Sequence, residues 1–356
     1  MKYLSRSRAF LLAWLFTSAM VLLPALHVCG CTSIAWQTKL GEITGRTMDW
    51  YTSTEARIYV FPAGIGRDGG MLLGKRIVKG RTVKWTSRYG SMVISVYGMG
   101  AVDGINSQGL NISANYFDSD YGRRNEKIKG LQVGLWVQYL LDEAATVKQA
   151  VQLMRHIQLV DFEARGKKAH VHLHIAGPRG DCAVLEYYHG RLHAYRSASY
   201  RVLTNAPAFP EQLANLKKFN FTNPNRDMPL PGNVNPLDRF VRASYYVNML
   251  PPPKDNLRAI LEMNSVLNNV AVPIGAPYQA MEGFNTYNTE YKVIANLKTK
   301  KYYFKFTTMP FMIWVSLSSF QLRPGGPVMM LNPENKLLYG NVAGHFKPVP
   351  LDKVPF

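Results

Sequence analysis

Cysteine and charged residues are scarce in this chain. Three cysteines among 356 residues are too few for a scaffold stapled by disulfides. Charged residues make up only 18% and hydrophobic residues 47%, which excludes a disordered chain and a coiled coil. After residue 30 no apolar run approaches the length that crosses a membrane. The composition is that of a folded protein with a large core.

Acidic residues are few as well, 23 against 42 lysines and arginines, which gives a formal net charge of +19. The basic residues are scattered in short clusters such as Arg123-Arg124, and no zinc-finger spacing or RNA-binding signature accompanies them. A nucleic-acid partner is therefore not expected. The charge favours attraction to anionic substrates or peripheral contact with an anionic envelope surface, and a solvated basic surface without a function is the alternative.

Residues 1–30 differ in composition from the rest. Three basic residues and no acid lie in the first eight positions, and residues 9–26 are almost wholly apolar. A basic start, an apolar stretch and small residues at the boundary, here Val28 and Gly30, are typical of a cleaved export signal. We therefore expect a periplasmic or secreted protein with a single domain over residues 31–356 and a net charge of +16. An uncleaved anchor helix is the alternative.

Short β-branched and aromatic segments predict strands on both sides of a helical centre. The predicted strands are TSIAWQT (32–38), EITGRTMDW (42–50), RIYVF (57–61), WTSRYGSMVISVYG (85–98), LNISANYF (110–117), AHVHLHIAG (169–177), CAVLEYY (182–188), HAYRS (193–197) and YRVLTN (200–205), followed by a hairpin in TEYKVIANLKTKKYYFKFT (289–307). Turns are expected at 64–70 and 103–109. This order indicates stacked sheets covered by helices in one domain.

Helical spacing of apolar residues predicts four helices. The predicted helices cover residues 131–143, 146–157 with Thr146 as the N-cap, 239–250 and 256–267. Residues 206–238 are rich in proline and asparagine and are expected to form a long loop.

Cleavage after Gly30 would make Cys31 the new amino terminus. An α-amino group titrates close to neutral pH and can take up the thiol proton, so a single residue would supply both the nucleophile and its base. Two other interpretations remain open. Cys31 is a buried small hydrophobe, or residues 28–31 are a degenerate lipoprotein signal with lipid on Cys31.

Arg46 and Asp49 lie at the end of the second predicted strand. If the first two strands form a hairpin, both side chains return towards Cys31. A guanidinium there favours the thiolate, and a carboxylate holds the α-ammonium group. A surface salt bridge is the alternative interpretation.

Several segments together resemble the choloylglycine hydrolase family, which includes bile salt hydrolases and penicillin V acylases. The segments are Cys31-Thr32-Ser33, Gly45-Arg46-Thr47-Met48-Asp49-Trp50, Trp85-Thr86-Ser87-Arg88-Tyr89-Gly90, Asp103-Gly104-Ile105-Asn106 with Gly109-Leu110, Asn115-Tyr116, Val202-Leu203-Thr204-Asn205, Leu230-Pro231-Gly232, Asp238-Arg239-Phe240-Val241-Arg242, Thr289-Glu290-Tyr291 and Tyr302-Tyr303-Phe304. They occur in order over nearly the whole chain after residue 30.

The resemblance implies an N-terminal nucleophile amidase with an α+β fold, a four-layer αββα sandwich. It implies Cys31 as nucleophile and base, Asp49 orienting the amine, and Arg46 beside the thiolate. It also implies that Asn205 and Asn115 bind the oxyanion and that Arg239 adds electrostatic support, as neutral and cationic donors do where negative charge develops. The resemblance implies a homotetramer, and it implies no metal or organic cofactor.

The acyl group of the substrate needs an apolar pocket. Five aromatic residues flank the expected site positions and are the candidates for it: Trp50, Tyr51, Tyr116, Phe117 and Tyr121. The expected substrates are N-acyl amides, namely conjugated bile salts, penicillin V or N-acyl homoserine lactones, cleaved through a thioester. The alternatives are a family amidase acting on N-acyl lipid amides and a non-catalytic, lipid-anchored envelope binding protein.

Two further features are expected to be structural. His170, His172 and His174 alternate along one strand without a nearby acid or cysteine at ligand spacing, which favours sheet packing over a metal site. Cys182 lies in a strand-like run and is expected to be a buried free thiol.

Overall fold

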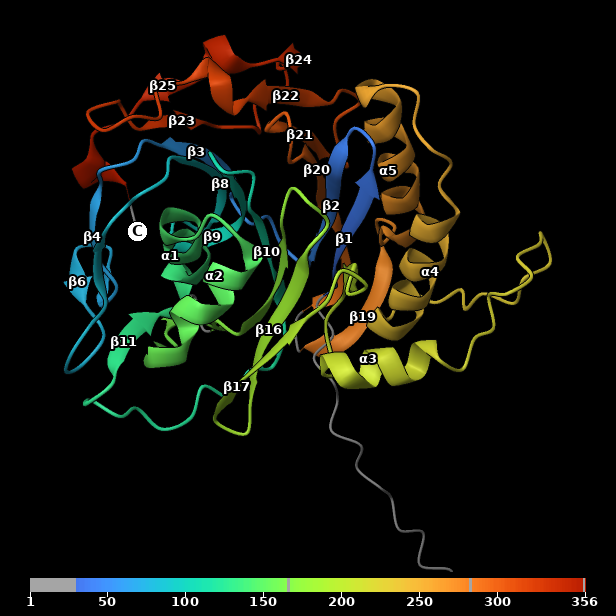
Figure 1. The fold of residues 1–356 in the computed structure, drawn as a ribbon, viewed down its shortest axis with the longest axis horizontal. Coiled ribbons are helices and arrows are strands. Elements are labelled where there is room, and N and C mark those ends of the chain that lie inside the picture. Colours follow the sequence, from blue (N-terminus) through green and yellow to red (C-terminus); the bar gives the residue numbers. More distant parts are fainter. Residues whose placement is uncertain (1–29, 165–166, 282–283, 355) are drawn as a thin grey trace, which may run out of the picture.

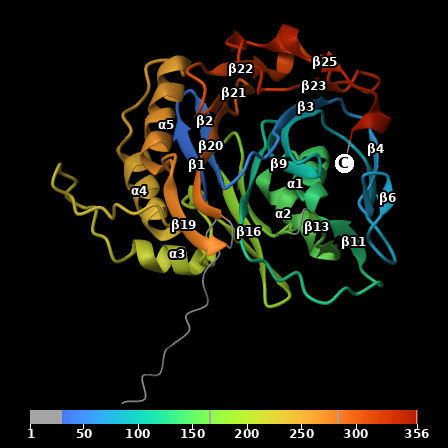
Figure 2. The ribbon, with the colours of Figure 1, turned by 180° about the vertical axis from the view of Figure 1, so that it is seen from behind.

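The computed structural model describes residues 30–164, 167–281, 284–354 and 356. The expected export signal therefore lies outside the described residues, apart from Gly30. Two large sheets form the centre of the molecule, and Figures 1 and 2 show them face to face with helices on both outer sides. The predicted α+β, four-layer αββα sandwich is confirmed.

The first sheet is antiparallel except for its last pair and runs in the order β18 (Val202–Leu203), β1 (Cys31–Thr38), β2 (Gly41–Trp50), β20 (Phe284–Asn296), β21 (Lys301–Phe306), β22 (Ile313–Ser316) and β24 (Gly340–Asn341), with β19 (Ala276–Met281) paired to β20. The second sheet runs in the order β17 (Arg191–Arg196), β16 (Cys182–Tyr188), β15 (Val171–Ala176), β10 (Asn111–Tyr116), β9 (Gly100–Asn106), β8 (Ser91–Val96), β3 (Arg57–Phe61), β23 (Met329–Leu331) and β25 (Lys347–Pro348). Both sheets therefore combine strands from distant parts of the chain.

Helices cover the outer faces. On the second sheet lie α1 (Trp136–Glu143) and α2 (Val147–Leu153), and on the first sheet lie α3 (Phe209–Leu216), α4 (Pro236–Met249) and α5 (Asn256–Val270) (Figure 1). Short two-stranded pairs complete the periphery: β4 (Gly66–Asp68) with β7 (Lys84–Thr86), β5 (Met71–Leu72) with β6 (Lys75–Arg76), β11 (Lys129–Gln132) with β12 (Ile157–Val160), and β13 (Glu163–Ala164) with β14 (Lys167–Lys168).

Three buried apolar clusters correspond to the three interfaces between the four layers. One lies between α1 and the second sheet and contains Trp136. The central cluster lies between the sheets and contains Tyr291 and Cys31. The third, around Phe240, lies between the first sheet and α3 to α5. Cys31 thus begins its strand at the central interface, where alternate side chains of both sheets meet.

Several element boundaries differ from the predictions. The expected turn at 103–109 is largely strand, because β9 continues to Asn106 and only the next residues turn. The helix expected over 131–143 begins at Trp136, since β11 and a 3-10 turn precede it. The helix expected over 146–157 ends at Leu153, although Thr146 caps it as predicted.

The segment expected to be a loop, residues 206–238, also differs from the prediction. The loop expected over 206–238 contains α3, and α4 begins at Pro236 instead of residue 239. Asn235 caps α4 by accepting a hydrogen bond from the Asp238 amide at 2.9 Å. Proline at the first helical position suits this start because its missing N–H would have no partner there.

Gly100 lies where the β8–β9 hairpin meets the turn before α1. A methyl group on it would lie 2.5 Å from the Gly134 carbonyl oxygen and 2.6 Å from the Gly134 Cα. We expect Gly100→Ala to lower the free energy of unfolding by about 2 kcal/mol, because overpacking forces the backbones apart. Urea denaturation measures it, with Gly66→Ala as the control because a methyl there meets nothing within 4 Å. Equal stability of the two variants would contradict the close approach.

Candidate active site

The β1–β2 hairpin brings the predicted site residues together. Cys31 pairs with Met48, and Ser33 pairs with Arg46, so the strand that follows the turn returns to the first residue of β1. Asp49 follows at a bulge between β2 and β20. Cys31, Arg46 and Asp49 are all buried, with side chains at most 2% exposed. The two predicted strands thus form the hairpin on which the expected approach of Arg46 and Asp49 to Cys31 depended.

Cys31 is held at both its nitrogen and its sulfur. Its backbone N–H donates to Asn205 Oδ1 at 2.6 Å. Its Sγ lies 3.8 Å from Arg46 Nη2 and 3.7 Å from Met48 Sδ. A guanidinium and a thioether thus flank the Cys31 sulfur.

Arg46 reaches across to the second sheet. Its Nη2 donates to the Ala114 carbonyl of β10 at 2.7 Å. Burial by itself lowers the pKa of Arg46, but the neighbouring Cys31, Tyr291 and Asp103 groups outweigh that effect and the net direction is upward. The guanidinium is therefore a permanent cation beside the sulfur.

Asp49 is fully buried and only partly paired. Its Oδ1 accepts a hydrogen bond from Thr289 Oγ1 at 2.5 Å. Its Oδ2 lies 3.6 Å from Arg239 Nη1 and accepts no hydrogen bond from the described residues. Burial raises the pKa of Asp49 to about 6, although the Arg239 charge and the Thr289 hydroxyl lower it. The Oδ2 oxygen therefore has room in its hydrogen bonding for a donor that the described residues do not provide.

Arg239 lies in the first turns of α4 and contacts the same residues from the other side. Its Nη1 donates to the Cys31 carbonyl at 2.8 Å and to Thr32 Oγ1 at 2.7 Å. Its Nη2 donates to Asn205 Oδ1 at 3.0 Å. Arg242, one turn later, donates instead to backbone carbonyls of residues 231 and 233, which distinguishes the two arginines.

The two asparagines differ in their surroundings. Asn205 Oδ1 receives the Cys31 amide, and its Nδ2 donates to the Tyr116 carbonyl at 2.7 Å. Asn115 Nδ2 donates to the Leu203 carbonyl at 3.0 Å and to the Thr204 carbonyl at 3.1 Å. Its Oδ1 accepts a hydrogen bond from Ser33 Oγ at 3.0 Å. In this state Asn115 links three strands, and both side-chain amides have protein partners. Their oxyanion role stays a prediction.

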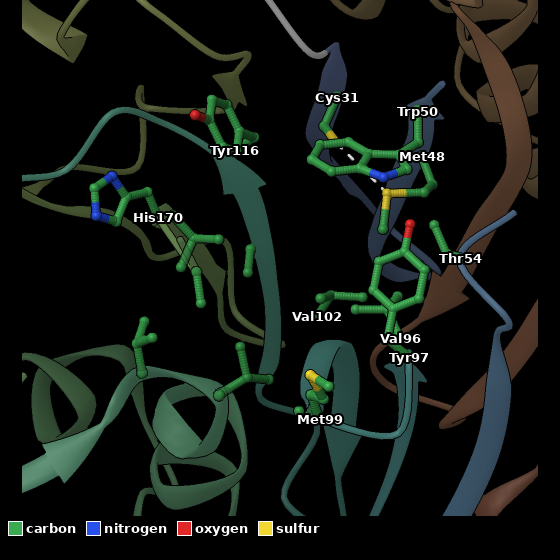
Figure 3. Close-up of a pocket in the computed structure, with 18 of the residues that line it drawn as sticks. Cys31, Met48, Trp50, Thr54, Val96, Tyr97, Met99, Val102, Tyr116 and His170 are labelled. Atoms are coloured by element: carbon green, nitrogen blue, oxygen red, sulfur yellow. Dashed lines mark hydrogen bonds between the residues drawn. The ribbon is translucent and has the colours of Figure 1, made fainter. Parts of the chain in front are cut away.

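A cavity of about 530 Å³ opens beside the Cys31 sulfur. Figure 3 shows Cys31, Met48 and Trp50 along one end, Met99 at the opposite end, and His170 and Tyr97 on facing sides. Its walls come from both sheets and from the segment after β2. The lining is mainly apolar and includes Met48, Trp50, Tyr51, Val96, Tyr97, Met99, Val102, Tyr116, Val133, Val137 and Phe162.

Three of the five predicted aromatic residues line this cavity: Trp50, Tyr51 and Tyr116. Trp50 stacks on Tyr51 with ring centroids 5.0 Å apart and lies 5.9 Å from Tyr116. Phe117 and Tyr121 do not line it. Phe117 points to the other side of β10 and stacks on His172, and Tyr121 packs in the core under α1. Alternation along the strand explains why neighbours in sequence face opposite ways.

Sequence reasoning assigned no role to several residues of this site. Thr289 was part of a matching segment, but its contact with Asp49 depends on the bulge in β20. Met48 lies two residues after Arg46 in β2, so both side chains are on the same face of the strand. This spacing could have placed Met48 on the Cys31 side. Tyr97 and Met99 lie in a turn whose position relative to Cys31 follows only from the packing of the two sheets.

The three histidines belong mainly to sheet packing. His172 Nε2 lies 2.8 Å from the Thr204 carbonyl and its Nδ1 lies 3.2 Å from Glu186. His174 Nε2 lies 2.9 Å from the Tyr200 carbonyl, and burial lowers its pKa to about 4. His170, by contrast, lines the cavity between two aspartates, at 3.1 Å from Asp118 and 3.5 Å from Asp161.

Other predicted features also have definite surroundings. Cys182 is a buried free thiol, and burial raises its pKa. No cluster of three or more metal-ligating side chains occurs among the residues that the structure describes. Within the same residues, no helix is both long and apolar enough to span a membrane.

Comparisons with known proteins agree with this geometry. Residues 31–332 match the family model of the linear amide C–N hydrolases, choloylglycine hydrolase family. The chain is 32% identical to a penicillin V acylase of Pectobacterium atrosepticum over 334 residues, which cover 86% of each chain. A conjugated bile acid hydrolase of Lactobacillus gasseri is 25% identical over 227 residues, 57% of this chain and 70% of that protein.

Solved structures show the same relationship. A penicillin V acylase from Agrobacterium tumefaciens superposes with a TM-score of 0.79 at 31% identity, covering 92% of this chain and 98% of that one. A mutant of the conjugated bile acid hydrolase from Clostridium perfringens gives a TM-score of 0.72 at 20% identity, covering 87% and 98%, which supports the fold. The chain therefore belongs to the choloylglycine hydrolase family and is a hydrolase of linear amide C–N bonds.

Proposed function

We propose that this protein is an exported amidase that uses Cys31 as an N-terminal nucleophile once residues 1–30 are removed. The observation that carries the proposal is the convergence on Cys31 of Arg46 at the sulfur, Asn205 at the nitrogen and a large apolar cavity. The basic, then apolar composition of residues 1–30 supports export to the periplasm or the medium.

The surroundings of Gly30 support activation by cleavage. A Cβ at this position would lie 3.0 Å from both Asp49 Oδ2 and Arg239 Nη2. The residue before Cys31 thus lies against the free carboxylate oxygen. Cleavage replaces the Cys31 amide by an amine, which keeps the Asn205 bond and gains Asp49 Oδ2 as a partner for its ammonium form. An amide nitrogen cannot take up a proton, so the uncleaved chain lacks the base.

The proposed reaction has two steps. The Cys31 amine takes the thiol proton, and the thiolate attacks the acyl carbonyl to form a tetrahedral oxyanion. When that intermediate collapses, the C–N bond breaks, the ammonium gives its proton to the leaving amine, and a thioester remains. Water, deprotonated by the same amine, then hydrolyses the thioester and regenerates the thiol. Asn205 and Asn115 are proposed to bind the oxyanion. Asn205 Nδ2 has a second N–H besides the one that it donates to the Tyr116 carbonyl, whereas Asn115 Nδ2 has to release one of its two carbonyl partners.

The proposed substrates are N-acyl amides with an apolar acyl group. Penicillin V and N-acyl homoserine lactones fit this description, and so do conjugated bile salts. The penicillin V acylases among the relatives support the first of these. A net charge of +16 after cleavage supports attraction of anionic substrates and peripheral contact with an anionic envelope. A homotetramer remains a proposal from the family resemblance.

The first test concerns processing. We expect a purified chain that starts at residue 1 to be inactive and the chain that starts at Cys31 to be active, measured as release of the free amine. Cys31→Ser should lower turnover at least about 100-fold, because a hydroxyl is much harder to ionise than a thiol. Intact mass distinguishes a free Cys31 from a lipidated one. Equal activity of the uncleaved chain would contradict the proposal.

The second test concerns pH. Burial raises the pKa of Asp49 to about 6, and the ammonium group of the processed enzyme should bring this pKa somewhat below 6. Because protonation neutralises the carboxylate, kcat/KM should decline as the pH falls through that pKa. Asp49→Asn should lower kcat/KM roughly 100-fold and remove the acid limb of the pH profile. An unchanged acid limb in this variant would assign the titration to another group.

The third test concerns the acyl pocket. Trp50→Ala removes a ring that lines the cavity, and each Å² of apolar area that substrate then leaves exposed costs roughly 25 cal/mol. KM should therefore rise about tenfold for phenoxyacetyl and long acyl groups but little for acetyl. Phe117→Leu is the control, because Phe117 is a neighbouring ring outside the cavity. A loss that is uniform across acyl lengths would show that Trp50 supports the fold and not the pocket.

A further inference from the structure

Glu290 is the extra residue of the bulge between β2 and β20. Met48 pairs with Tyr291 and Asp49 pairs with Thr289, so Glu290 stands between two pairs. Bulges interrupt the alternation of side chains and re-aim them, and they are frequent beside active sites. Thr289 turns to Asp49, as described above, and Glu290 turns to the segment that follows β2.

The Glu290 carboxylate holds this segment by its backbone. The Thr54 N–H lies 3.0 Å from Oε1 and 3.2 Å from Oε2, and Ser53 Oγ donates to Oε1 at 3.2 Å. Burial raises the pKa of Glu290, while these donors lower it. Hydrogen bonds to an ionised carboxylate are stronger than those between neutral groups. One side chain therefore fixes residues 52–55, all of which line the cavity.

Thr54 passes this constraint to the neighbouring turn between β8 and β9. Its carbonyl accepts the Tyr97 N–H at 2.8 Å, and Thr52 Oγ1 lies 3.2 Å from the Tyr97 hydroxyl. Tyr97 has φ 54° and begins the turn that carries Met99 into the cavity. Figure 3 shows Thr54 and Tyr97 beside each other, on the side of the cavity that faces His170. Glu290, Thr54 and Tyr97 thus form a chain of contacts from β20 to the β8–β9 turn.

We propose that Glu290 is a positioning residue for acyl-group specificity, because it fixes the cavity wall formed by residues 52–55 and the Tyr97–Met99 turn. Glu290 itself does not line the cavity. It acts through Thr54, so its loss should widen and loosen the acyl pocket while the groups around Cys31 remain in place. This inference rests on the proposed amidase function.

The experiment uses the processed enzyme and a series of amides that share one leaving amine and carry acetyl, phenoxyacetyl or dodecanoyl groups. Glu290→Ala removes the acceptor, and Glu290→Gln keeps a carbonyl oxygen for the Thr54 N–H. Glu334→Gln is the matched control, since Glu334 also contacts Ser53, at 3.4 Å, but pairs with Arg57 and not with the backbone of Thr54.

Glu290→Ala should raise KM about tenfold for the phenoxyacetyl and dodecanoyl amides, and change kcat and the acetyl kinetics less than twofold. Glu290→Gln should recover most of the loss, and Glu334→Gln should match the wild type. A uniform loss across acyl lengths, an unchanged KM in Glu290→Ala, or an equal effect of Glu334→Gln would overturn the proposal. If Glu290→Ala does not fold, Glu290→Asp replaces it, because the shorter side chain withdraws the carboxylate from the Thr54 N–H. Reduced acyl discrimination in Glu290→Asp then supports the proposal, and wild-type discrimination overturns it.

A binding measurement separates this inference from the amidase proposal. In a Cys31→Ala background, calorimetry with the dodecanoyl amide reports acyl binding without turnover. A roughly tenfold weaker Kd after adding Glu290→Ala supports the positioning role even if no amide in the series is hydrolysed, and an unchanged Kd overturns it even in an active enzyme.

Discussion

One buried guanidinium, that of Arg239, fixes Cys31, the first residue of β1. It donates to the Cys31 carbonyl, to Thr32 and to Asn205, and it lies 3.6 Å from Asp49. Burying such a cation is costly unless a charge and hydrogen-bond acceptors surround it. Asp49 provides the charge, and the same burial raises the pKa of that carboxyl. The arginine therefore stabilises the carboxylate that the proposed ammonium group needs, and it places the acceptor oxygen of Asn205 at the nitrogen.

The opposite side of the site depends on buried polar groups that fix Asn205 from the second sheet and from α3. His172 and Asn115 both bond to the Thr204 carbonyl, and Gln212 donates to the Asn205 carbonyl at 2.5 Å. A fully satisfied network of this kind is rigid, and rigidity gives electrostatic stabilisation its value in catalysis. The two sheets are thus connected beside the proposed nucleophile by hydrogen bonds as well as by the apolar core.

Local pattern was sufficient to predict much of the fold. Short β-like runs predicted the two strands whose hairpin brings Arg46 and Asp49 to Cys31, and the strand–helix–strand order indicated stacked sheets. Helix starts were predicted less well: the stretch before Trp136 has helical spacing but pairs as β11 with β12, a long-range contact that the apolar spacing does not encode. The same limit applies to the site. Phe117 and Tyr116 are adjacent, and only the position of β10 between two layers decides which ring reaches the cavity. The bulge at Glu290 depends on pairing with a strand about 240 residues earlier in the chain.

The space around Gly30 connects the proposed export with the proposed mechanism. A side chain larger than hydrogen would meet Asp49 Oδ2 and Arg239 Nη2 at 3.0 Å and the Tyr287 ring at 3.1 Å. The groups that would crowd a side chain there are the ones that the proposed mechanism assigns to the free amine. A side chain on the preceding residue would have to displace them by a few tenths of an ångström. Signal cleavage also favours small residues at this boundary. The proposed export and the buried charges are unrelated constraints, and both favour the same small residue before Cys31.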